Sequence, residues 1–199
     1  MAPAAGRKRS EANSRRSQIL AETARIVAER GYFGFGIQEL AERCGLTKPG
    51  LLHHFGSKDQ LLIALLNDLD AKEEADLAAI FLPLQEQAAT AEAHCKTYRQ
   101  ALRTVMERAL KQPEIVRLHL ILRTESLNPA HPGHAHLKAR EAMVLDRLAK
   151  GARPFAAEPL SAARQILALM YGLQEQWIRE DRSFDLAAEW SRALDAMTF

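Results

Sequence analysis

The feature that most restricts the fold is residues 36–62, GIQELAERCGLTKPGLLHHFGSKDQLL, where two short helix patterns flank a glycine. Apolar residues recur at helical spacing before Gly45, and glycine readily adopts the left-handed conformation that ends a helix. Thr47 is placed to cap the second short helix and Ser57 a third, since a hydroxyl side chain accepts hydrogen bonds from free backbone N–H groups. A helix, a tight glycine turn and another short helix predict a helix-turn-helix, whose second helix enters the major groove of DNA.

The second of these helices begins with residues suited to DNA. Lys48 can reach a guanine edge or a phosphate, while Pro49 and Gly50 lack bulk and let the backbone approach the groove. Upstream, Arg15 and Arg16 form a basic cluster that can lie along phosphates. The residues that we expect to contact DNA are Thr47, Lys48, Pro49, Gly50, His53, His54 and Lys58. The alternative, an ordinary helical hairpin, explains the apolar residues of the segment but not its basic and histidine cluster.

This segment resembles the DNA-binding domain of the tetracycline-repressor (TetR) family of bacterial transcription regulators. The matching residues keep the family's order and spacing over residues 16–62: Ala41, Gly45, Leu46, Thr47, Leu51, His54, Phe55, Ser57, Lys58 and Leu61. The chain departs from the family at Leu52, where the family usually has a tyrosine that touches the DNA backbone, so that contact is not carried over. The resemblance implies a homodimeric, ligand-responsive repressor that binds a palindromic operator in double-stranded DNA and is released by a small-molecule effector.

Composition and charge agree with a folded DNA-binding protein. The chain of 199 residues is 47% hydrophobic, enough to bury a core. Residues 1–58 hold ten Lys/Arg and five Asp/Glu, a balance of +5, and the other 141 residues hold seventeen and twenty, a balance of −3. The positive excess therefore lies with the helix-turn-helix, where a polyanion needs it. No apolar run approaches the roughly 20 residues that span a bilayer, and no secretory signal is evident, so we expect a cytoplasmic protein without a membrane partner.

Helical patterns continue over the rest of the chain, and strand patterns are absent. We expect an all-α protein of about nine helices, with a long helix from Ser57 to about Leu82 that links two domains. Residues 1–13 are expected to form a disordered basic arm and residues 14–60 the helix-turn-helix domain. Residues 61–199 are expected to form a helical domain for effector binding and dimerisation.

Apolar stripes on the last two helices predict the dimer interface. Leu167 and Met170 lie on the stripe of the penultimate helix, and Trp190 and Leu194 lie on that of the last. In the TetR family these two helices pair with their copies in a second subunit to form a four-helix bundle. The alternative is that both stripes only cover the core of one subunit. We favour the dimer, since one helix-turn-helix reads too few base pairs to select a genomic site.

The middle helices offer candidates for an effector pocket, because such sites are mostly apolar with a few polar groups that orient the ligand. The candidates are Tyr98, Met106, His119, Arg123, Tyr171, Gln174 and Trp177. Arg123, with His119 one turn earlier, could hold an anion. The same residues are also typical of an ordinary helical core, and the resemblance does not name a ligand.

Catalytic motifs are absent from the sequence, so we expect no enzyme, no catalytic residues and no cofactor beyond the effector. His131, His134 and His136 could bind a transition metal, but they lie in a Pro/Gly loop that we expect to be exposed, and we predict no metal site. The alternatives left open are an architectural DNA-binding protein without an effector and a metal-responsive regulator that uses this loop. Activation instead of repression also stays open.

Overall fold

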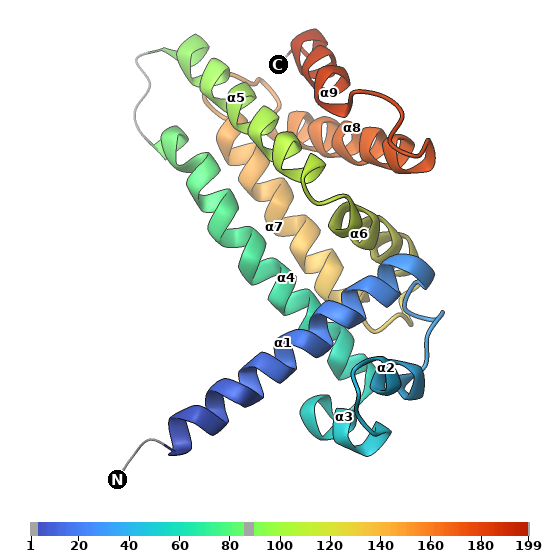
Figure 1. The fold of residues 1–199 in the computed structure, drawn as a ribbon. Helices are drawn as coiled ribbons and strands as arrows, with labels where there is room; N and C mark the ends of the chain where they lie inside the picture. The colour runs from blue at the N-terminus through green and yellow to red at the C-terminus, as the bar shows by residue number, and fades with distance from the viewer. Residues whose placement is uncertain (1–3, 86–89, 199) are drawn as a thin grey trace.

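The structure, a computed structural model, is entirely helical over the residues that it describes, which are 4–85 and 90–198, with side chains for residues 14–84 and 90–198 (Figure 1). The nine α-helices of these residues are α1 (Ala4–Arg30), α2 (Ile37–Arg43), α3 (Lys48–Phe55), α4 (Lys58–Phe81), α5 (Ala91–Leu110), α6 (Pro113–Glu125), α7 (His134–Ala152), α8 (Pro159–Arg179) and α9 (Leu186–Ala196). A 3₁₀ turn, η1 (Leu82–Gln85), follows α4. The predicted all-α fold is confirmed.

The N-terminal helix differs from the sequence expectation. We predicted a disordered arm over residues 1–13, yet α1 begins at Ala4. The first three residues lie outside the described part of the chain, as do the side chains of residues 4–13, which include three consecutive basic residues at 7–9. Alanine, arginine, lysine and glutamate have high helix propensity, which accounts for the early start of α1.

The helix-turn-helix forms as the glycine and capping residues predict. Gly45 has a φ of 64°, and the turn is closed by a hydrogen bond of 2.8 Å from the backbone N–H of Leu46 to the carbonyl of Ala41. The Thr47 hydroxyl accepts a hydrogen bond of 3.2 Å from the N–H of Gly50, and the Ser57 hydroxyl accepts one of 3.1 Å from the N–H of Gln60. These contacts fix where α3 and α4 begin.

Two apolar cores hold the molecule together, and α4 contributes to the first along its N-terminal half. This core joins α1, α2 and α3 to Leu61 and Leu69 of α4, and it also takes in Leu118 and Leu122 of α6 and Leu137 of α7. It therefore crosses the boundary that we placed after residue 60. The second core lies between α5, α7, α8 and α9, with α5 and α7 running beside α4 (Figure 1).

The second core overturns one prediction. Leu167, Met170, Trp190 and Leu194 were expected at a dimer interface, but their exposed fractions are 5%, 9%, 1% and 0% in the single chain. The alternative interpretation of the two stripes is therefore correct for these residues, because α5 and α7 pack on α8 and α9 and cover the apolar faces. Among the described helices, none is both long and apolar enough to span a membrane.

Candidate DNA-binding surface and ligand cavity

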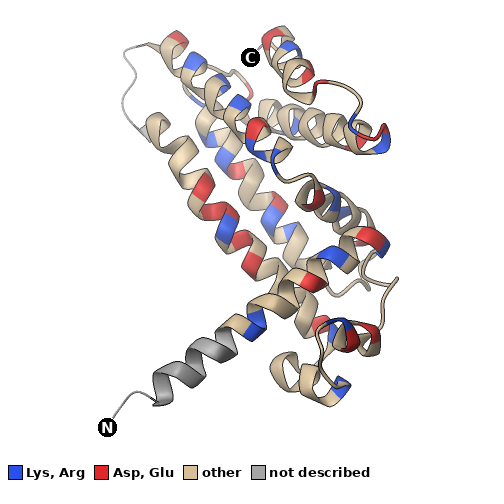
Figure 2. Ribbon diagram, in the orientation of Figure 1, with Lys and Arg blue, Asp and Glu red and all other residues tan. Residues whose placement is uncertain are grey.

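The helix-turn-helix presents one side of α3 on the surface. Leu51 and Phe55 are buried and anchor the helix to the first core, whereas Lys48, Pro49 and His53 are exposed. Of the other predicted contacts, Thr47 is exposed at the N-cap, and Gly50 and His54 are half-buried. The helix carries no acidic residue, so nothing on it repels a phosphate (Figure 2). These six residues share a surface with the composition that DNA contact requires.

Lys58 is placed differently from our expectation that it would contact DNA. Its ammonium group donates a hydrogen bond of 2.6 Å to the carbonyl of Phe35 and lies over the rings of Tyr32 and Phe35, 4.5 and 4.3 Å from their centroids. Burial lowers the pKa of Lys58. The sequence could not show this, because both aromatic rings come from the turn between α1 and α2.

Arg16 lies at the edge of the same surface. Its guanidinium donates a hydrogen bond of 3.0 Å to the carbonyl of His54 and stacks 4.4 Å from the centroid of the Phe55 ring. The side chain is nevertheless exposed, so the charge remains available to a phosphate. Leu52, which replaces the tyrosine common in the resembled family, is half-buried and has no polar group to offer.

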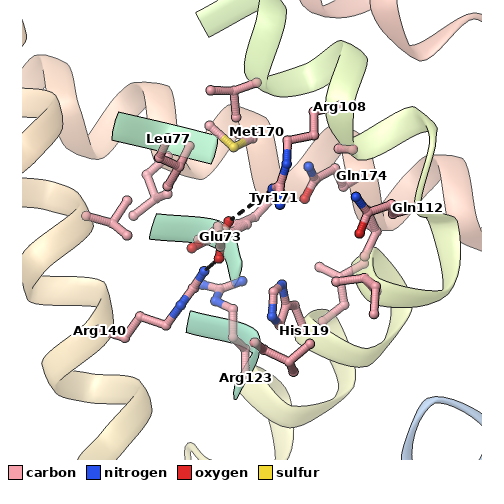
Figure 3. Close-up of a pocket in the computed structure, with 18 of the residues that line it drawn as sticks. Glu73, Leu77, Arg108, Gln112, His119, Arg123, Arg140, Met170, Tyr171 and Gln174 are labelled. Atoms are coloured by element: carbon pink, nitrogen blue, oxygen red, sulfur yellow. Dashed lines mark hydrogen bonds and ion pairs between the residues drawn. The ribbon is translucent and has the colours of Figure 1, made fainter. Parts of the chain in front are cut away.

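A cavity of about 290 Å³ lies between α4, α5, α6, α7 and α8 (Figure 3). Its wall is mostly apolar, with a few polar side chains from several helices, which is the usual character of a small-molecule site. Of the predicted pocket residues, His119, Arg123, Tyr171 and Gln174 line the cavity. Leu167 and Met170, which we had expected at the dimer interface, line it as well.

Three predicted pocket residues lie in the second core and do not line this cavity. Tyr98 is fully buried, and its hydroxyl donates a hydrogen bond of 2.9 Å to the carbonyl of Leu148. Met106 is buried beside Gln174, whose amide nitrogen lies 3.8 Å from its sulfur. Trp177 is also buried in that core. Apolar spacing alone does not distinguish a core residue from one that faces a cavity, which explains the error.

Five charged residues that line the cavity were not predicted from the sequence, and three of them meet there: Glu73 on α4, Arg108 on α5 and Arg140 on α7. The other two are Lys72 and Arg147. Arg140 forms an ion pair with Glu73, and Arg108 Nη1 lies 4.0 Å from Glu73 Oε1. The only available signal was a charge on a helix face that is otherwise apolar. Because the three residues come from separate helices, the sequence could not show that they meet.

His119 and Arg123 face the cavity from adjacent turns of α6 (Figure 3). Burial lowers the pKa of His119 to about 4, so its imidazole is neutral near pH 7. The Arg123 guanidinium stacks 3.4 Å from the centroid of the Tyr171 ring, and its Nη2 lies 3.3 Å from Glu141. The Nε atom of Arg123 is buried and has no hydrogen-bond partner.

The histidine loop does not bring its three imidazoles together. His131, expected to be exposed, is buried against Tyr32, and its Nδ1 accepts a hydrogen bond of 3.1 Å from the N–H of Gly133. His134 contacts the carbonyl of Ser126 at 2.7 Å, and His136 contacts Asp70 at 2.7 Å. Within the described residues, no group of three His, Cys, Asp or Glu is arranged to hold a metal ion.

Glu125, at the C-terminal end of α6, joins that helix to the turn between α1 and α2. Its carboxylate accepts a hydrogen bond of 2.8 Å from the backbone N–H of Tyr32, and a Cβ atom at Gly31 would come within 2.2 Å of its Oε1. The Tyr32 hydroxyl bonds in turn to Asp59, near the start of α4. Arg123 lines the cavity two residues before Glu125, so one helix end contacts both the cavity and the α1–α2 turn.

These features define a class of protein: an all-α chain with an N-terminal helix-turn-helix and a ligand-sized cavity in its C-terminal helices. Residues 19–65 match the family of bacterial regulatory proteins called the tetR family. The chain therefore carries the DNA-binding domain of the TetR family.

Individual relatives agree with this assignment. The transcriptional activator FasR of Mycolicibacterium smegmatis is 39% identical over 67 residues, and the transcriptional repressor AcnR of Corynebacterium diphtheriae is 36% identical over 70 residues. These matches cover 32% and 35% of this chain, and 31% and 36% of the relatives, so the chain spans about a third of the length of the curated relatives it matches.

The fold as a whole extends the likeness to the C-terminal helices. A solved structure of AibR in complex with isovaleryl coenzyme A and operator DNA has a TM-score of 0.66 and 23% sequence identity to this chain. The superposition covers 93% of this chain and 98% of AibR. The likeness of fold therefore extends over all the helices, and not only over the first four.

Proposed function

We propose that the protein is a dimeric transcription regulator that binds a palindromic operator through α3 and responds to a small molecule held in the cavity. The observation that carries this proposal is the pairing of an exposed, acid-free α3 with a ligand-sized cavity beside α4, the helix that both domains share. AibR binds both an acyl coenzyme A and operator DNA, which supports the same pairing here.

We favour repression, since AcnR, matched in the DNA-binding domain, is a repressor. Release then follows if the effector binds more tightly to a conformation that does not fit the operator, because a ligand shifts an equilibrium only by its difference in affinity for the two states. An architectural DNA-binding protein without an effector would have no use for a cavity with converging polar groups. The relatives named above are transcription regulators, which argues against an enzyme.

Lys48 provides the test of DNA binding. Lys48→Ala is expected to weaken operator binding by about 1–3 kcal/mol if the side chain reads a base, with relaxed preference at one position of each half-site. If it contacts only phosphate, affinity falls uniformly and the salt slope drops by about one. Titration of a selected palindromic duplex and a scrambled duplex measures both. Lys96→Ala, an exposed lysine on α5, is the control; equal binding by both variants would refute the assignment of α3 as the reading helix.

We expect the dimer interface on the outer face of α8, where Ala168 and Leu169 are exposed and a Cβ atom added at Gly172 would meet nothing within 4 Å. Small residues on this face let two helices approach closely. We therefore propose this face as the dimer interface in place of the buried stripe that we had predicted. The second copy of this chain would then cover it.

Gly172→Arg should leave each subunit folded, because the space around Gly172 is open in the single chain, but should separate the subunits. Analytical ultracentrifugation at micromolar concentration is expected to show a dimer of the 22.2 kDa chain for the wild type and a monomer for the variant. Ala78→Arg, on an exposed position of α4, should remain dimeric. A monomeric wild-type protein, or a dimeric Gly172→Arg variant, would show that the interface lies elsewhere.

A further inference from the structure

Positive charge converges on the cavity from several helices. Lys72, Arg108, Arg123, Arg140 and Arg147 all line it, whereas Glu73 is the one carboxylate that does so among the described residues. A cluster of guanidinium groups next to apolar walls is suited to carboxylate or phosphate oxygens, which arginine binds through two parallel hydrogen bonds.

The arginines have partners behind them that hold them in position. Arg140 Nε lies 2.7 Å from Asp70, and Arg108 Nε lies 2.7 Å from Asp76. Neither of these two carboxylates lines the cavity. Arginine has five N–H donors, so each of these side chains keeps donors for a group inside the cavity.

Glu73 is the group inside the cavity that these two arginines contact. It pairs with Arg140 and lies 4.0 Å from Arg108, and Figure 3 shows it between the two, with Arg123 nearby. The carboxylate is thus the anion that the cluster holds when no ligand is present. Arg123 also lines the cavity, and its buried Nε atom has no hydrogen-bond partner, so it is a further free donor.

We propose that the effector joins an apolar body to an anionic group, and that its carboxylate or phosphate oxygens displace Glu73 from Arg108 and Arg140. The inference rests on the proposed function, since it names the chemistry of that effector. Displacement also has a mechanical consequence. Glu73 belongs to α4, so a ligand that takes its place removes the contacts of Glu73 with Arg108 of α5 and Arg140 of α7. The contacts of Asp70 and Asp76 with the same arginines remain, and the N-terminal end of α4 packs in the core of the helix-turn-helix domain.

The test is isothermal titration of the full-length protein with octanoate, benzoate and octanoyl coenzyme A, and with 1-octanol and octylamine as matched neutral and cationic compounds. At least one anionic compound should bind more tightly than 1-octanol and octylamine. Glu73→Gln keeps the shape of the side chain and removes its charge. It should therefore tighten the binding of that anionic compound by about tenfold, because the ligand no longer competes with a charge-assisted hydrogen bond of Glu73. Arg108→Gln should weaken the same compound by a similar factor. Asp146→Asn, which removes a carboxylate that pairs with Lys150 on the surface of α7, is the matched control and should change nothing.

If Glu73→Gln tightens the binding of the free acids only, the arginines bind the carboxylate of the effector. If it tightens the binding of octanoyl coenzyme A only, they bind a phosphate. Unchanged or weaker anion binding in a folded Glu73→Gln protein, tighter binding of octylamine than of every anion, or no anion binding at all would overturn the inference. These titrations need no DNA. If the titrations contradict the anion site while the protein still binds an operator, only the anion site is refuted. If the protein binds no operator, the proposed function is refuted.

Discussion

Trp190→Ala is expected to lower the free energy of unfolding by about 3–5 kcal/mol, the range for removing a buried tryptophan side chain. Trp190 is 1% exposed, and its indole N–H donates a hydrogen bond of 3.0 Å to the carbonyl of Leu102. The substitution therefore leaves a cavity between α5, α8 and α9 and removes one buried hydrogen bond. Urea denaturation measures the loss. Wild type and variant are compared at the same protein concentration, because the apparent stability of a dimer depends on concentration.

Trp190→Phe separates the two effects. It retains most of the packing and removes the indole donor, so a smaller loss of about 1–2 kcal/mol is expected. The pair of variants also distinguishes a core residue from an interface residue. If Trp190→Ala yielded a monomer with the unfolding free energy of the wild type, Trp190 would lie at the subunit interface, and the packing of α9 on α5 would be wrong.

Acidification is expected to destabilise the protein through His119. Its pKa is lowered to about 4 in the folded chain, mainly by burial, against 6.5 for an unperturbed histidine. The unfolded chain therefore binds a proton at a higher pH than the folded chain does, and stability falls as the pH drops from 6.5 towards 4. The difference between these two pKa values corresponds to a loss on the order of 3 kcal/mol, of which about 2 kcal/mol is lost by about pH 5.

His119→Gln should remove this part of the pH dependence. Chemical denaturation of both proteins at about pH 7.5 and pH 5 gives the comparison, and the variant should lose about 2 kcal/mol less than the wild type over this interval. His131, whose pKa burial also lowers, contributes in the same direction in both proteins and so cancels. Equal losses would mean that His119 is solvated well enough to accept a proton in the folded state.

The local signals in the sequence predicted the helix-turn-helix well. Gly45 and the capping residues Thr47 and Ser57 act within a few residues, so their consequences do not depend on the rest of the fold. Prolines likewise placed helix ends: α6 begins at Pro113, and α4 ends two residues before Pro83. Such positions depend on backbone geometry that the residue itself carries.

Long-range packing was harder to predict. The apolar stripes of α8 and α9 were recognised, but such a stripe serves an internal core or a second subunit equally well, and only the positions of α5 and α7 decide between the two. Lys58 was expected on the surface for its charge, yet two aromatic rings and a carbonyl from a separate turn hold it inward. His131 was expected in an exposed loop and is instead buried against Tyr32.

The first core has a consequence for protein engineering. The simplest way to exchange sensory and DNA-reading modules between regulators of this fold is a cut near the end of the third helix. In this chain such a cut would strip the DNA-reading module of Leu118, Leu122 and Leu137, which fill its interior, and of the Glu125 carboxylate that holds the backbone of Tyr32. A working chimera needs α4, α6 and the first turn of α7 transplanted together with the reading head, or their apolar contacts rebuilt in the recipient.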